Sequence, residues 1–230
     1  MQPFTYPSYE EPLLSAYEGR YECCYVLLHP FVRISAPAAA SVISYPTDEQ
    51  IASSGEKYKW RDVAMEANLQ TYCEVNHGLL SLILALKDEF QNESAANAIR
   101  KVIDPDRSVW IPAAGCFPAL LQPDILSAFE AAHSDEMVYV PEFPDAHPIQ
   151  TLKITDLGNF GRATFPYRGT LLPADESFLF TVDWDSFFTL LYGPRSFVTK
   201  FVESPHPEGF FLTPSTRHHW WRESDSFILN

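Results

Sequence analysis

Two apolar β-type runs joined by a short polar link constrain the fold of this chain most strongly. Residues 178–182 (FLFTV) and 187–192 (FFTLLY) flank the link Asp183-Trp184-Asp185-Ser186. Aspartate and serine side chains favour turns because they hydrogen-bond nearby backbone amides. The pattern therefore predicts an antiparallel hairpin, which must join a larger sheet to bury its apolar side chains.

Other β-rich runs predict the rest of that sheet. We expect further strands in four ranges: residues 21–32, where Pro30 interrupts the run, 137–143, 152–155 and 208–212.

Gly193-Pro194 follows the hairpin and favours the start of a helix.

Helical patterns are predicted mainly in the N-terminal half. Thr47 with Gln50 forms a capping-box pattern, and Asn76 is a suitable N-cap for a helix over residues 77–91. We expect that apolar helix to be central, packed on strands at 23–28, 178–182 and 187–192, so that Ile83→Ala is costly.

The fold class predicted from this element order is α+β. A helical N-terminal half packs on a mainly antiparallel sheet that the C-terminal third largely contributes. We expect a single domain over residues 1–230, with residues 1–20 as an extended arm.

Charge and composition exclude several functions. The formal charge is −14, which repels nucleic acids and anionic lipid headgroups. The longest apolar run, at 79–86, is too short to span a bilayer, and the N-terminus lacks a signal-peptide pattern. The four cysteines lack metal-ligand spacing, so we expect reduced thiols, a cytoplasmic location and no cofactor.

The Asp-x-Asp link after an apolar strand resembles the nucleophile loop of haloacid dehalogenase-like phosphatases. In that family the first aspartate attacks phosphorus and the second acts as an acid. The context differs here, because the family needs a lysine and further acidic ligands well downstream, and Phe187 stands where it carries threonine. A structural hairpin turn is therefore the favoured interpretation.

The segment TPSTRHHWWRE, residues 213–223, is a locally basic and aromatic stretch in an acidic chain. Adjacent histidines point in different directions, so they do not easily share a metal ion, and no metal site is expected. One interpretation is a terminal helix capped by Thr213 and begun by Pro214. The other is a partner-binding surface, because Trp and Arg are enriched at interface hot spots. Its residues would be Arg217, His218, Trp220, Trp221 and Arg222.

Several segments together resemble an uncharacterised bacterial protein family of unknown function. They are LLHPFV at 27–32, DWDSFFTLLYG at 183–193, EGFF at 208–211 and the closing His/Trp segment. The C-terminal half is also similar in style to toxin-immunity proteins. This resemblance brings no catalytic residues with it.

Three functional hypotheses follow, one of which is a plain structural or regulatory subunit. The favoured one is an acidic, cytoplasmic binding protein, of immunity type in one version, that contacts a basic protein partner or a second copy of itself and is not an enzyme. The alternative is a hydrolase with a C-terminal Asp/His site, with or without a divalent ion. Its candidate catalytic residues are Asp183, Asp185, His206, His218 and His219.

Overall fold

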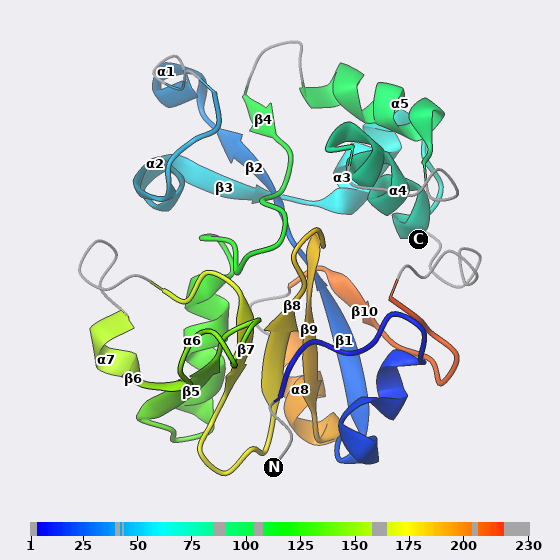
Figure 1. Ribbon diagram of the computed structural model, residues 1–230. Helices are drawn as coiled ribbons and strands as arrows, with labels where there is room; N and C mark the ends of the chain where they lie inside the picture. The colour runs from blue at the N-terminus through cyan, green and yellow to red at the C-terminus, as the bar shows by residue number, and fades with distance from the viewer. Residues whose placement is uncertain are drawn as a thin grey trace. The chain divides into compact units, whose positions relative to one another are not determined.

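The computed structural model describes residues 4–39, 42, 44–84, 91–103, 108–157, 165–203 and 207–218 (Figure 1). The chain folds into two compact units. Among the described residues, the first unit contains those up to Leu28 and those from Ala114 to His218. The second contains those from His29 to Ala113.

The first unit is built on an antiparallel sheet of seven described strands, in the order β10-β1-β9-β8-β7-β5-β6. The strand bounds are β1 Cys23–Leu28, β5 Glu136–Val140, β6 Gln150–Lys153, β7 Gly169–Leu172, β8 Leu179–Val182, β9 Phe188–Gly193 and β10 Gly209–Phe211.

The predicted hairpin is confirmed as β8 and β9, which pair antiparallel with Val182 opposite Thr189. β1 pairs along the other edge of β9, with Tyr25 opposite Leu191. All six residues of β1 and all six of β9 are buried, as expected for strands in the middle of a covered sheet.

Helices cover one face of this sheet. They are α6 (Gln122–Ala131), α7 (Ile154–Leu157) and α8 (Arg195–Glu203), and α8 begins directly after the Gly193-Pro194 signal. The core on this face joins Phe129 of α6 and Val198 of α8 to Leu191 and Phe180 of the strands.

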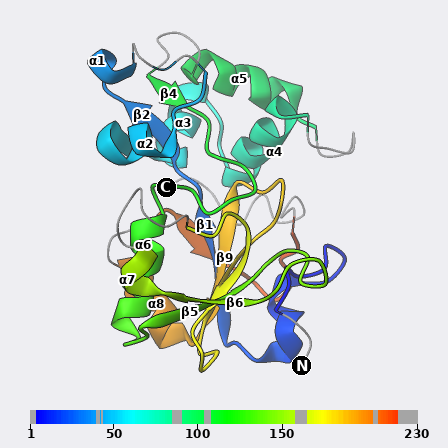
Figure 2. The ribbon, with the colours of Figure 1, turned by 60° about the vertical axis from the view of Figure 1, so that its left-hand side comes forward.

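The N-terminal segment covers the opposite face, as Figure 2 shows from the side. This segment is extended and then enters a 3-10 element, η1 (Leu13–Gly19). The hydroxyl of Tyr192, on β9, donates to the carbonyl of Leu13 at 2.9 Å, and the Tyr17 and Tyr192 rings meet edge to face at 5.2 Å. The expected arm is therefore held against the sheet.

The second unit combines a small sheet, ordered β3-β2-β4, with several helices. Its bounds are β2 Phe31–Ile34, β3 Gly55–Tyr58, β4 Val109–Trp110, α1 Ala36–Ala39, α2 Asp48–Ser54, α3 Trp60–Ala67, α4 Tyr72–Leu82 and α5 Glu93–Ile103. Trp60 is fully buried, and its indole N–H donates to the carbonyl of His29 at 2.6 Å.

The mixed helix and sheet composition and the large antiparallel sheet agree with the predicted α+β class. The helices, however, are not confined to the N-terminal half as predicted. Helices occur through the whole chain, and the sheet core is covered by α6 and α8. The helix predicted over 77–91 is wrong in its bounds and its partners. α4 ends at Leu82 and packs on α5 and α3.

The predicted helix starts are only partly confirmed. The capping box of Thr47 and Gln50 is confirmed at α2. Asn76 is not an N-cap, because a second capping box, Thr71 with Glu74, starts α4 and leaves Asn76 buried inside the helix. The helix expected from Pro214 is also absent over the described part of that segment, where Thr213 to Thr216 form a turn.

Candidate functional site

The link between β8 and β9 is a tight turn that sends its side chains in different directions. The hydroxyl of Ser186 donates to the carbonyl of Asp183 at 3.0 Å, and the amide of Ser186 to the same carbonyl at 3.3 Å. Asp183 is 8% exposed and Trp184 is 58% exposed. The turn therefore supplies one buried acid and one exposed aromatic ring.

The buried acid lies in a cluster of four polar side chains. Tyr9 donates its hydroxyl to Oδ2 of Asp183, and the ring of Tyr9 stacks on the imidazole of His218 at a centroid distance of 4.1 Å. Nε2 of His218 lies 3.8 Å from the same carboxylate oxygen. The hydroxyl of Tyr6 lies 2.9 Å from Nδ1 of His218.

Burial controls the protonation of this cluster. It raises the pKa of Asp183, although hydrogen bonds from Tyr9 and from the amide of Trp184 act in the opposite direction. Burial also raises the pKa of Tyr6 and of Tyr9, and the Asp183 carboxylate adds to both shifts. Both phenols therefore stay protonated, and in the neutral imidazole a Tyr6 hydroxyl that donates to Nδ1 leaves the proton on Nε2, facing Asp183.

A second set of charges lies closer to the surface. Nη1 of Arg168 pairs with Oε2 of Glu142 at 3.1 Å, and Nε donates to the carbonyl of Gly115 at 2.7 Å. Burial and the Glu142 carboxylate raise the pKa of Asp185, while Arg168 lowers it. Asp185 is thus electrostatically coupled to the Arg168–Glu142 pair.

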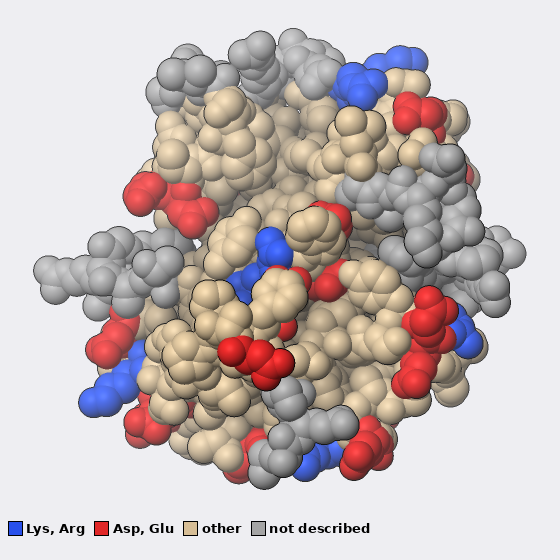
Figure 3. Space-filling model, in the orientation of Figure 1, with Lys and Arg blue, Asp and Glu red and all other residues tan. Residues whose placement is uncertain are grey.

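Exposed aromatic residues accompany these charges: Phe143 follows Glu142, Trp184 precedes Asp185, and the Arg168 guanidinium lies 5.6 Å from the centroid of the Tyr167 ring. Phe143 is 62% exposed, Tyr167 64%, Trp184 58% and Tyr9 44%. We call these four residues, with Arg168, Glu142 and Asp185, the aromatic face. Figure 3 shows acidic and basic side chains meeting near the centre of the view, among large uncharged ones. Large exposed aromatic side chains gathered in one place are uncommon on a surface that contacts only water.

Gly115 holds the loops of the aromatic face together. Its amide donates to the carbonyl of Ser186 at 2.8 Å, and its φ of +61° is in the left-handed region. A Cβ atom at this position would overlap the carbonyl of Trp184. Two residues on, the amide of Phe117 donates to the carbonyl of Tyr167 at 3.0 Å. The loop around Gly115 therefore fixes both Trp184 and Tyr167.

The structure brings together only part of the residue set predicted from the sequence. Asp183 and His218 meet, and Asp185 lies near them on the same turn. Arg217 donates to the carbonyl of Glu10, so it ties the C-terminal segment to the N-terminal arm. The remaining predicted residues lie outside the described part of the chain: His206, His219, Trp220, Trp221 and Arg222.

Several residues of the site were missed in the sequence. Tyr6, Tyr9, Glu142 and Arg168 belong to no motif, and Tyr9 is 174 positions away from Asp183 in the chain. Gly115 could have been identified from the sequence, because an isolated glycine in a loop often marks a left-handed residue or a close backbone approach.

The described residues form neither a metal-ligand cluster nor a membrane-spanning helix. No three histidine, cysteine, aspartate or glutamate side chains among them are grouped as a metal ion would need. None of the helices built from them has the length and apolarity to cross a membrane.

Comparison with known proteins places the chain in a family. A family model described as "Protein of unknown function (DUF2711)" matches residues 9–222. The chain belongs to this family. The predicted resemblance to an uncharacterised bacterial family is thereby confirmed.

The chain is also similar to the uncharacterized protein YwbB of Bacillus subtilis (strain 168). The two are 23% identical over 221 residues, which cover 93% of this chain and 96% of YwbB. No solved structure matches the chain.

Proposed function

We propose that this DUF2711 protein acts by binding a protein partner, and that the aromatic face is its contact surface. The observation that carries the proposal is the set of four aromatic side chains, each 44–64% exposed, that lie next to Arg168, Glu142, Asp183 or Asp185 in the chain or in space. Tryptophan, tyrosine and arginine are the residues most enriched among interface hot spots. This surface is proposed in addition to the one predicted from the sequence at Arg217, His218, Trp220, Trp221 and Arg222.

The geometry of the face suits recognition. Arg168 is held by Glu142 and by the carbonyl of Gly115, so its guanidinium is already ordered before any partner binds. An ordered side chain loses less conformational entropy on association. Arg168 therefore favours a specific contact over a non-specific one.

Charge favours a basic partner. The chain carries a net charge of −14, and Asp185 and Glu142 place two carboxylates in the aromatic face itself. Opposite charge on the partner would accelerate the encounter and select against acidic competitors. An immunity-type protein that binds a basic toxin in the cytoplasm is one form of this proposal, and the four free cysteines suit a reducing compartment.

A pull-down from lysate of the source cells tests the proposal. The bait would be wild-type protein, Trp184→Ala or Tyr45→Ala. Tyr45 is 39% exposed and belongs to the second unit, so it is a matched control. We expect one stoichiometric protein on wild-type and Tyr45→Ala baits, released by rising salt and lost from Trp184→Ala. Equal retention by all three baits, or no retention at low salt, would contradict the proposal.

A second candidate function is a hydrolase centred on Asp183 and His218. It is favoured by the buried carboxyl group of Asp183, whose raised pKa suits a general acid, beside an imidazole 3.8 Å away. Tyr9 stacks over His218, so it would have to move to admit a substrate. A screen of phosphate and ester substrates, with and without divalent ions, tests this function. Turnover that is abolished by Asp183→Asn would support the hydrolase function. A screen without turnover of any substrate would contradict it.

A further inference from the structure

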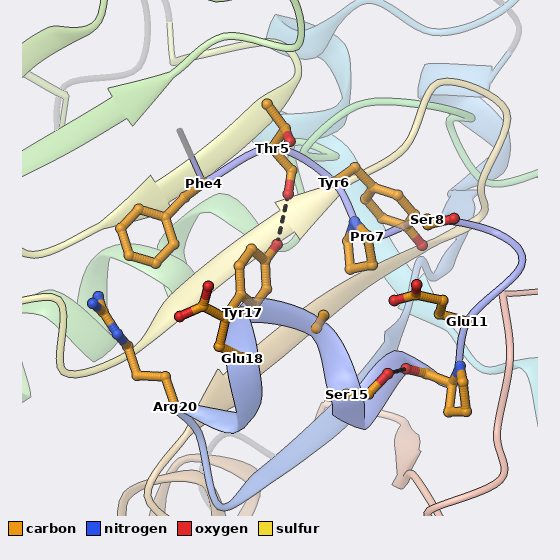
Figure 4. Close-up of a pocket in the computed structure, with 12 residues that line it drawn as sticks. Phe4, Thr5, Tyr6, Pro7, Ser8, Glu11, Ser15, Tyr17, Glu18 and Arg20 are labelled. Atoms are coloured by element: carbon orange, nitrogen blue, oxygen red, sulfur yellow. Dashed lines mark hydrogen bonds between the residues drawn. The ribbon is translucent and has the colours of Figure 1, made fainter. Parts of the chain in front are cut away.

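The N-terminal segment encloses a half-open cavity of its own, apart from the aromatic face. Residues 4–8 run alongside η1, and the space between them has a volume of about 560 Å³. Figure 4 shows the rings of Phe4, Tyr6 and Tyr17 around this space. Cavities of this size commonly bind small molecules.

Tyr17 and its neighbours maintain the cavity at a conformational cost. The hydroxyl of Tyr17 donates to the carbonyl of Thr5 at 2.9 Å, which bridges the two walls. Tyr17 and Glu18 have φ values of 55° and 58°, and Gly19 continues the left-handed turn at 68°. Consecutive non-glycine residues in this region are strained, and such strain is often found where a ligand binds.

The cavity wall is acidic. Its basic side chain, Arg20, pairs with Glu176 and lies 5.2 Å from the Phe4 ring centroid. The carboxylates of Glu11 and Glu18 have no hydrogen-bond or ion-pair partner among the described residues. In Figure 4, Glu18 lies toward Phe4 and Tyr17, whereas Glu11 lies toward Ser8 and Ser15. Two unpaired negative charges therefore face the same cavity from different positions.

We propose that this cavity binds a small aliphatic amine with at least two protonated nitrogen atoms. One ammonium group would pair with Glu18 beside the ring of Tyr17, where a cation is also attracted to the ring face. The other would pair with Glu11 and donate to the hydroxyls of Ser8 and Ser15. An anionic ligand would be repelled, and a neutral one would gain no attraction from the two exposed carboxylates.

Calorimetric titration of the full chain with spermidine tests the proposal at an ionic strength of about 0.15 M, where attraction between exposed charges is largely screened beyond ~8 Å. Glu11→Gln and Glu18→Gln should each weaken spermidine binding by about fivefold or more. Glu10→Gln is the matched control, because it removes the same charge one residue away from the cavity wall. We expect the control to change the affinity by less than about twofold.

Three results would overturn the proposal. The first is no heat of binding with wild-type protein. The second is an equal loss of affinity in Glu10→Gln, which would show that spermidine responds only to the net charge. The third is equally tight binding of butylamine, which would show that a second ammonium group is not recognised. None of these results bears on the aromatic face, so the proposed function is tested separately.

Discussion

At the scale of single residues, Gly115 supports the aromatic face most directly. Its positive φ and its close approach to Trp184 both require the absence of a side chain. Gly115→Ala should lower the free energy of unfolding by about 3 kcal/mol or more, since the overlap adds to the backbone cost. Urea denaturation measures this loss.

Gly19 is the control for that substitution. It also has a positive φ, of 68°, but a Cβ atom there would meet nothing within 4 Å. Gly19→Ala should therefore cost only about 1 kcal/mol, which is the cost of the backbone conformation alone. Equal losses in the two variants would show that the contact with Trp184 contributes nothing.

Asp183 makes stability depend on pH. The usual pKa of an aspartate is 3.8, and burial raises it in the folded state, which therefore binds the proton more tightly than the unfolded state. The stabilisation that results is present below pH 3.8 and is lost as the pH rises through the raised pKa. Asp183→Asn removes this dependence, so its free energy of unfolding relative to wild type should rise as the pH increases from 3.8 through the raised pKa.

Denaturant titrations at several pH values check the sign of this effect. Asp145→Asn, at an exposed position, controls for the loss of one negative charge. A relative stability of Asp183→Asn that falls with pH would mean that the ionised carboxylate is stabilised, with His218 as its cation.

The sequence identifies only those site residues whose own neighbourhood carries a signal. Asp183 and Asp185 stand out because they follow an apolar strand, and His218 because two histidines precede two tryptophans. Tyr9 and Arg168 look like ordinary surface residues, and only the folded chain places them beside Asp183 and Gly115. Contacts between residues far apart in the chain leave no local pattern.

At the scale of elements, α4 shows what an apolar run does and does not predict. The start of the run at 79–86 lies in the buried part of α4, but the helix ends at Leu82 and its partners are α3 and α5, not the strands of the large sheet. Periodicity reports which positions are apolar, and it does not report which surface they face. The same limit explains why α6 and α8 were not expected to cover the sheet.

Substitutions along α4 distinguish the observed bounds from the predicted ones. Leu79 is fully buried, whereas Ile83 is half-buried and lies just past the helix end. Leu79→Ala should cost about 3 kcal/mol of unfolding free energy, and Ile83→Ala about 1 kcal/mol. Urea denaturation followed by tryptophan fluorescence measures both. A larger loss of unfolding free energy for Ile83→Ala than for Leu79→Ala would support the longer central helix predicted from the sequence.

At the scale of the whole molecule, local elements were predictable and long-range pairing was not. The hairpin β8–β9 and helix α8 follow each other in the chain, so turn and helix-start signals define them. The place of β1 between β10 and β9 depends on pairs such as Tyr25 with Leu191, which no local signal specifies. The proposed function also depends on long-range pairing, because the arm, the strand turns and the loops each supply part of the aromatic face.

The central claim is that the aromatic face contacts a protein in the cell. Site-specific photo-crosslinking tests it even when the partner is unidentified, with a photoreactive amino acid at Tyr167 or, as the control, at Tyr45. Both side chains are exposed, at 64% and 39%. We predict a discrete crosslinked protein band from position 167 that is missing from position 45 and weakened by Trp184→Ala. The same bands from both positions, or none from position 167, would contradict the claim.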